Sequence, residues 1–245
     1  MKQNKYDDPG FFANYSQMPR SVGGLEAAGE WESFRPMLPE LAGKRVLDIG
    51  CGFGWHCRYV RGQGAASVVG IDISENMLAR ARELTEDPTI TYRRLAIEDL
   101  DYPNGAFDVV VSSLALHYIA RFDDVCRTVH RLLAAGGSFV FSVEHPVFTA
   151  RAAQDWHYGP GGEKLHWPVD QYYEEGLREA RFLENDVIKY HRTVSTMLNA
   201  LIEAGFRIRK LSEPQPAAEL LAENPAMRDE LRRPLFLMVA ADRLD

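Results

Sequence analysis

From position 44 onward, hydrophobic residues alternate between short runs typical of buried strands and longer stretches of helical length. One helical stretch ends near Gly62, and a second begins at Ser74, a residue type that caps helices, and runs towards Pro88. A third is expected to close at Gly136 and Gly137. Strands and helices that take turns predict a parallel sheet covered on both faces. The apolar and β-branched runs lie at 45–49, 67–72, 89–96, 107–113 and 138–144.

Towards the C-terminus, the pattern predicts a hairpin, a helix and two more strands. The hairpin would pair 176–183 with 187–193 across Glu184, Asn185 and Asp186, and Thr193 would cap the helix that follows. RIRKL and LFLMVAADRL supply the last two strands. The complete fold is therefore expected to be an α/β, doubly wound, seven-stranded and mostly parallel sheet.

Two segments fall outside this rhythm and divide the chain. Residues 1–43 are expected to form an ordered N-terminal arm or lid, in which Tyr15 and Arg20 can fold over a ligand, although Arg20 can equally face solvent. Residues 44–245 form the main domain, with 146–192 as an insertion that acts as a substrate lid. The aromatic residues of the insertion can contact a substrate or form a small core of their own. They are Phe148, Trp156, Tyr158, Trp167, Tyr172, Tyr173 and Phe182.

The segment VLDIGCGFGW carries the most informative motif. Asp48 ends the first strand, and Gly50, Gly52 and Gly54 form G-x-G-x-G at the turn into the helix. Glycines there let a ligand approach the backbone closely. The dinucleotide fingerprint has the spacing G-x-G-x-x-G, but Trp55 occupies its third place here. This spacing argues against a nicotinamide-dependent oxidoreductase, which remains the alternative to be tested.

Asp72 ends the second strand, where doubly wound nucleotide-binding folds place a carboxylate against ribose hydroxyls. Its two acceptor oxygens can bind a vicinal diol. An isolated aspartate at this position is often only a turn residue, but together with the glycine turn it indicates a nucleoside ligand.

Four segments, VLDIGCGFGW, VVGIDISENML, IEDL and FDVVVSSLALHYI, resemble class I S-adenosylmethionine-dependent methyltransferases, of the small-molecule, type 11 kind, over roughly residues 44–145. The resemblance implies that the glycine turn contacts the methionine part of S-adenosylmethionine and that Asp72 binds the ribose. It further implies that Ile73 and Met77 flank the adenine, that Ile97 and Glu98 lie at its edge, and that Ser113 lies beside the cofactor. With the arm residues, the expected cofactor-binding set is Tyr15, Arg20, Asp48, Gly50, Cys51, Gly52, Gly54, Asp72, Ile73, Met77, Ile97, Glu98 and Ser113.

Methyl transfer from a sulfonium needs a base only when the nucleophile carries a proton. Four residues are expected at or near the carboxyl ends of the strands, where a base could act: His117, Glu144, His145 and His191. Each also has a structural alternative: His117 can bond a neighbouring loop, Glu144 and His145 can end a strand before Pro146, and His191 can be an exposed strand residue.

Composition narrows the class of partner. The chain has 28 Lys and Arg against 35 Asp and Glu, a net charge of −7, which disfavours nucleic acid and favours a small-molecule acceptor. A protein acceptor and the oligomeric state stay open, as does a non-catalytic module that only binds S-adenosylmethionine. Three cysteines without a C-x-x-C pair predict no metal site, and the lack of a long apolar run predicts a cytoplasmic protein without a membrane span.

Overall fold

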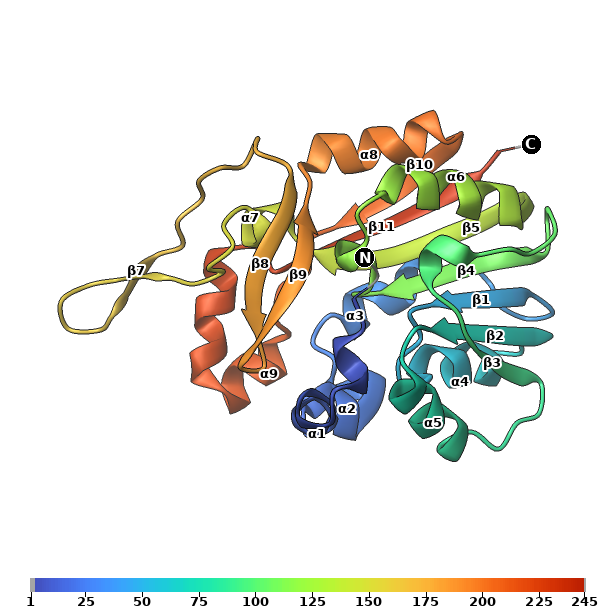
Figure 1. The fold of residues 1–245 in the computed structure, drawn as a ribbon, viewed down its shortest axis with the longest axis horizontal. Coiled ribbons are helices and arrows are strands. Elements are labelled where there is room, and N and C mark those ends of the chain that lie inside the picture. Colours follow the sequence, from blue (N-terminus) through green and yellow to red (C-terminus); the bar gives the residue numbers. More distant parts are fainter. Residues whose placement is uncertain (1–2, 245) are drawn as a thin grey trace.

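A seven-stranded sheet in the order β10-β11-β5-β4-β1-β2-β3 forms the centre of the protein (Figure 1). The structure is a computed structural model that describes residues 3–244, apart from the side chains of Glu219 and Glu223. β1 to β5 pair in parallel, while β11 is antiparallel to both β5 and β10. The mostly parallel, doubly wound sheet predicted from the sequence is confirmed. Its strands are β1 (Arg45–Ile49), β2 (Ser67–Asp72), β3 (Ile90–Arg94), β4 (Phe107–Ser113), β5 (Leu133–Glu144), β10 (Phe206–Ser212) and β11 (Phe236–Arg243).

Helices cover the two faces of the sheet because each carries one apolar stripe. On one face, α6 (Phe122–Leu132) and α8 (Val194–Glu203) pack through residues such as Val129 and Leu201. On the other face, α4 (Trp55–Gly62), α5 (Glu75–Glu83) and the N-terminal α3 (Trp31–Phe34) pack through Val60, Leu78 and Trp31. The caps expected from the sequence are present, since Ser74 accepts the Met77 N–H and Thr193 accepts the Thr196 N–H.

The strand order indicates where on the sheet a ligand can bind. The strand order reverses between β1 and β4, which are hydrogen-bonded neighbours. β1, β2, β4 and β5 are parallel, so their carboxyl ends lie at the same end of the sheet. Doubly wound sheets bind ligands at this end, next to the point where the strand order reverses, which is called the switch point.

The N-terminal arm consists of short helices below the sheet edge (blue in Figure 1). Asp8 caps the first of them by accepting the Phe11 N–H. Besides α3, the helices are α1 (Pro9–Ser16) and α2 (Pro19–Gly23), with 3-10 turns at Lys5–Asp7, Gly24–Ala27 and Arg35–Met37.

The segment between β5 and α8 begins with α7 (Pro146–Thr149) and contains two separate hairpins. Phe148 stacks on Trp167 at 5.1 Å, and Trp156 meets Trp167 edge to face at 5.4 Å. These three aromatic side chains therefore contact one another in a small cluster, whereas Tyr173 is 89% exposed. The hairpins pair β6 (His157–Tyr158) with β7 (Lys164–His166) and β8 (Gly176–Phe182) with β9 (Asn185–His191).

Two local boundaries differ from the sequence prediction. α6 ends at Leu132 and β5 starts at once, so Gly136 and Gly137 lie inside a strand rather than closing a helix. The second hairpin turns at Leu183 and Glu184, both with positive φ, so Asn185 and Asp186 belong to β9. A two-residue turn of this kind usually contains Asn-Gly, which explains why the sequence did not mark it.

The remaining elements connect the main strands. α9 (Ala218–Glu223) follows β10, and 3-10 turns occur at Ile97–Asp99, Leu116–Tyr118 and Pro225–Arg232. Across residues 3–244, no helix has both the length and the apolar character required to cross a bilayer.

Candidate active site

The turn after β1 exposes its backbone to a cavity. Gly50 and Gly52 have φ values of 73° and 53°, which residues with a side chain rarely adopt. A Cβ at Gly50 would lie 2.4 Å from the Cβ of Ala115, whereas a Cβ at Gly52 would meet no atom within 4 Å. Gly50, Cys51 and Gly52 line the cavity, while Gly54 precedes α4 and is not among the described residues that line it. The peptide of Gly52 is therefore open to a ligand.

Asp72 faces the same cavity from the end of β2. Its carboxylate accepts hydrogen bonds from the backbone N–H groups of Gly52 and Ser74, both at 2.9 Å. Burial raises the pKa of Asp72 to about 6, although these two N–H donors act in the opposite direction. A ligand that donates to this carboxylate would compensate the cost of its burial.

Asp48 lies deeper than the glycine turn and is not among the described residues that line the cavity. It is buried, and the Cys57 thiol donates to its Oδ2 at 3.2 Å. Its Oδ1 has no hydrogen-bond partner among the residues that the structure describes. Burial raises the pKa of Asp48 to about 7. Direct binding of a ligand by Asp48 stays a prediction, and its observed contacts are those of a residue that supports the turn from behind.

The other residues implied by the resemblance surround the Asp72 side of the cavity. Met77 is almost fully buried at the start of α5, and Ser113 ends β4. The cavity-lining members of this group are Ile73, Met77, Ile97, Glu98 and Ser113.

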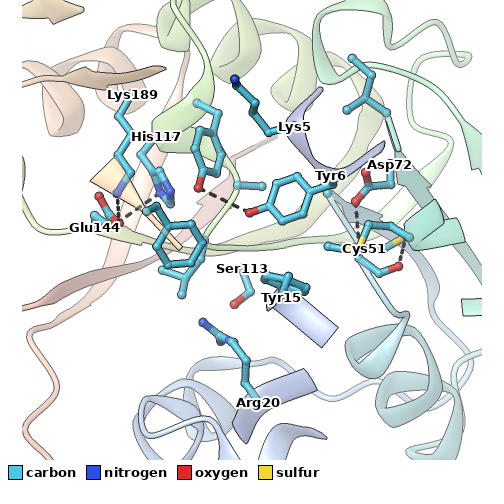
Figure 2. A pocket seen from close by; sticks show the side chains of 18 of the residues that line it. Lys5, Tyr6, Tyr15, Arg20, Cys51, Asp72, Ser113, His117, Glu144 and Lys189 are labelled. Carbon is cyan, nitrogen blue, oxygen red and sulfur yellow. Dashed lines mark hydrogen bonds and ion pairs between the residues drawn. The ribbon is translucent and has the colours of Figure 1, made fainter. Parts of the chain in front are cut away.

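Residues of the arm line the cavity, and Figure 2 shows Tyr6 between Asp72 and Glu144, with Tyr15 and Arg20 below it. Arg20 forms an ion pair with Glu30 and is not a free surface cation. Tyr15 and Arg20, which the sequence analysis expected at the site, line the cavity, and their contact with a cofactor stays a prediction. The sequence analysis did not include Tyr6, whose hydroxyl lies 3.4 Å from the hydroxyl of Tyr118.

Hydrogen bonds to two neighbouring segments hold the arm in this position. The Asp7 carboxylate accepts hydrogen bonds from the Ser74 hydroxyl at 2.6 Å and from the Asn76 N–H at 3.1 Å. Gln3 accepts the Ile188 N–H of β9 at 2.6 Å. The arm is thus attached both to the helix after Asp72 and to the β8–β9 hairpin.

Of the four base candidates, His117 and Glu144 line the cavity. Burial lowers the pKa of His117 to about 4, so its ring is neutral at neutral pH. Glu144 is occupied on both carboxylate oxygens, because Oε1 lies 2.6 Å from Lys189 Nζ and Oε2 accepts from Gln154 Nε2 at 3.2 Å. Neither side chain is a strong, unoccupied base.

His145 and His191 are not among the described residues that line the cavity. His145 caps α7 by accepting the Val147 N–H at 3.0 Å, and its Nε2 lies 2.8 Å from a Glu213 carboxylate oxygen. His191 uses Nδ1 towards the Thr149 hydroxyl and Nε2 towards the Tyr172 carbonyl. Their roles as bases stay predictions, and the contacts observed for them are those of structural residues.

One continuous cavity of about 750 Å³ joins the glycine turn and Asp72 to His117 and Glu144. This volume lies in the upper part of the usual range for ligand sites, roughly 300–1,000 Å³. We call the part lined by Tyr6, His117, Tyr118, Glu144, Phe148, Phe182 and Lys189 the acceptor side.

Comparison with known proteins identifies this arrangement. Residues 47–141 match the family described as "Methyltransferase domain". The crystal structure of an S-adenosylmethionine-dependent methyltransferase from Mesorhizobium loti is 47% identical, covers 90% of this chain and 100% of its own, and superposes with a TM-score of 0.84. A protein from Listeria monocytogenes assigned to the same class is 52% identical, with coverage of 91% and 100% and a TM-score of 0.86.

An uncharacterised protein of Haemophilus influenzae is 33% identical over 100% of this chain and 98% of its own.

Relatives with named acceptors match only part of the chain. A tRNA U34 carboxymethyltransferase of Alcanivorax borkumensis is 34% identical over 45% of this chain and 35% of its own. A ubiquinone biosynthesis O-methyltransferase of Pseudomonas aeruginosa is 40% identical over 42% of this chain and 45% of its own. These partial matches span different classes of acceptor.

Proposed function

The chain belongs to the class I S-adenosylmethionine-dependent methyltransferases, and from this premise we propose that it methylates a small molecule bound on the acceptor side of the same cavity. The observation that carries the proposal is that residues of the arm and of the β8–β9 hairpin line the acceptor side, in the same cavity as the cofactor-type residues.

The residues on the Asp72 side fit S-adenosylmethionine. The half-buried carboxylate of Asp72 has two oxygens for the ribose hydroxyls, and the open peptide of Gly52 allows close approach of the methionine part. Ile73, Met77 and Ile97 offer apolar surface to the adenine, and Arg20 offers a guanidinium to the carboxylate of the cofactor.

When bound, S-adenosylmethionine supplies an electrophilic methyl group on a positively charged sulfur. The residues of the chain hold the acceptor and exclude water around it. Alignment of this kind can contribute about 7–11 kcal/mol to lowering a barrier, because freedom of motion is removed before the reaction.

The shape and charge of the site support a small acceptor over a nucleic acid. Residues of the arm and of the hairpin line the cavity together with His117, and the Gln3 and Ile188 contact joins the two segments. The net charge of −7 also opposes binding to a phosphate backbone. The three cysteines are free and buried, which supports a reducing, cytoplasmic location for the reaction.

The test is transfer of a labelled methyl group from S-adenosylmethionine into a cell extract that is then separated into metabolite, RNA and protein fractions. We expect the label among the metabolites, and loss of the label with Asp72→Ala. Label in RNA or protein would contradict the small-molecule acceptor, while cofactor binding without any transfer would support the non-catalytic alternative. Thermal stabilisation by NAD but not by S-adenosylmethionine would favour an oxidoreductase.

A further inference from the structure

Lys189 is a buried cation in the wall of the acceptor side. It lies on β9 between Val187 and His191, and all three side chains are buried on the same face of the strand. The Lys189 side chain is only 1% exposed, although lysine is almost never buried without a specific partner. Its ammonium points to Glu144, and His117 lies beside them (Figure 2).

The ammonium group is only partly satisfied by the protein. Its Nζ donates to Glu144 Oε1 at 2.6 Å and to Gln154 Oε1 at 2.9 Å. An ammonium carries three protons, and within the described residues no other atom accepts a hydrogen bond from it. The pair of Lys189 and Glu144 is neutral overall, so one strong donor remains without adding net charge to the cavity.

Aromatic rings flank this donor. The ammonium lies 5.6 Å from the ring centre of Phe182 and 5.9 Å from that of Phe148, and both rings line the cavity. Tyr6 and Tyr118 extend the aromatic wall on the acceptor side. A flat ring fits between such walls because ring faces and edges pack favourably on one another.

Among the described residues, the acceptor side also offers no strong, free base. His117 is neutral and weakly basic, and the Glu144 carboxylate is held by Lys189 and Gln154. The charged groups that act on His117 are Glu144, Lys189, Arg192 and Arg20, and Lys189 and Arg20 are paired with Glu144 and Glu30 respectively. The side chains described on the acceptor side are therefore poorly suited to remove a proton from a nucleophile.

We propose that Lys189 binds the oxygen of a phenol-type acceptor and holds it as the phenolate, so that the reaction is an O-methylation. This inference rests on the proposed methyltransferase function. The acceptor gives its proton to bulk water as it binds. A lone pair of the phenolate oxygen forms the new oxygen–carbon bond while the carbon–sulfur bond breaks, and the electron pair of that bond stays on sulfur. The products are a neutral ether and S-adenosylhomocysteine.

The single free N–H of Lys189 distinguishes this acceptor from two others. A carboxylate prefers the two parallel donors of an arginine, whereas one ammonium proton suits one oxygen. An amine offers no negative charge to the ammonium, and its protonated form would be repelled by it. A ring-bound hydroxyl is thus favoured over a carboxylic acid and over an amine.

The experiment uses 4-nitrophenol, whose ionised form absorbs at longer wavelength, with the protein saturated by S-adenosylhomocysteine. We expect the pKa of bound 4-nitrophenol to fall below that of the free compound. The isosteric control 4-nitroaniline should bind about tenfold more weakly or worse, as expected for the loss of a hydrogen bond between charged groups. Tighter binding of 4-nitrobenzoate than of 4-nitrophenol would overturn the phenol assignment.

The matched variant is Glu144→Gln with Lys189→Met, because removal of the lysine alone leaves a buried, unpaired carboxylate and threatens folding. We expect this double variant to bind S-adenosylhomocysteine as the wild type does and to lose the pKa shift of 4-nitrophenol. Lys189→Arg keeps the charge and should retain part of the shift. Wild-type protein that binds S-adenosylhomocysteine but binds 4-nitrophenol as the neutral phenol, or not at all, would overturn the inference alone. Failure to bind S-adenosylhomocysteine would overturn the proposed function as well.

Discussion

The backbone N–H of Gly52 donates a hydrogen bond to the Asp72 carboxylate at 2.9 Å, across 20 positions of the chain. This contact joins the turn after β1 to the end of β2. The protein itself therefore orients the Asp72 carboxylate, a kind of preorganisation that favours ligand binding.

Replacement of Asp72 tests its role as the ribose acceptor. Asp72→Asn keeps the shape but removes the charge, so we expect S-adenosylhomocysteine to bind roughly ten- to a hundredfold more weakly at pH 8, as measured by calorimetry. Unchanged affinity would remove Asp72 from the binding site.

The pH dependence of the same binding gives a second, independent prediction. The pKa of Asp72 in the folded protein is raised to about 6, so the carboxyl becomes protonated and loses acceptor strength as the pH falls through that value. Wild-type affinity should therefore rise between about pH 5 and pH 7 and then level off. The Asp72→Asn variant should lack this step, and a step of equal size in both proteins would assign it to another group.

Asp48 should affect stability more than cofactor affinity. Its pKa is about 7 in the folded protein against an ordinary 3.8, so the native state binds the proton more tightly and its stability falls as the pH rises between these values. Asp48→Asn removes this loss. We expect the variant to gain about 1 kcal/mol or more in unfolding free energy at pH 8 and to lose this advantage near pH 4. Denaturant unfolding at both pH values checks the sign, and a destabilised variant at pH 8 would contradict it.

Asp7 should control how firmly the arm closes. Asp7→Ala removes the acceptor for the Ser74 hydroxyl and the Asn76 N–H, a loss comparable to that of a helix cap, about 1 kcal/mol. We expect release of S-adenosylhomocysteine to become roughly fivefold faster in stopped-flow measurements. Glu32→Ala is a suitable control, since Glu32 is exposed and its ion pair in the described part of the chain is with Arg35 at the surface. Equal release rates in both variants would show that the arm does not gate the site.

Replacement of His117 should lower the turnover rate less than the loss of a general base would. A base contributes typically about 10²–10⁴-fold to a rate. Because the acceptor is held as an anion, we expect His117→Asn to lower turnover by less than about tenfold. A larger loss, together with a pH profile that the variant alone changes, would restore His117 as the base.

The sequence predicted the frame of the site because its signals are local. Short apolar strands, the glycine turn and Asp72 each carry their meaning within a few residues, and the sheet brings them together at its switch point. The cap residues Ser74 and Thr193 were recognisable for the same reason.

Long-range contacts account for what the sequence did not reveal. The residues next to Lys189 in the sequence do not indicate that it pairs with Glu144, which is 45 positions away. Lysine in a hairpin is also usually exposed. The one available signal was the alternation of β9, which places Lys189 on the same face as Val187. Gln3 and Tyr6 reach the site through contacts with Ile188 and Tyr118 that no local pattern encodes.

A crystal structure of the protein with S-adenosylhomocysteine tests the shared cavity most directly. We predict that the ribose hydroxyls donate to the Asp72 carboxylate and that the open face of the sulfur is directed towards His117 and Lys189. A ribose bound elsewhere, or a sulfur whose open face points away from the acceptor side, would contradict the placement of donor and acceptor in one cavity.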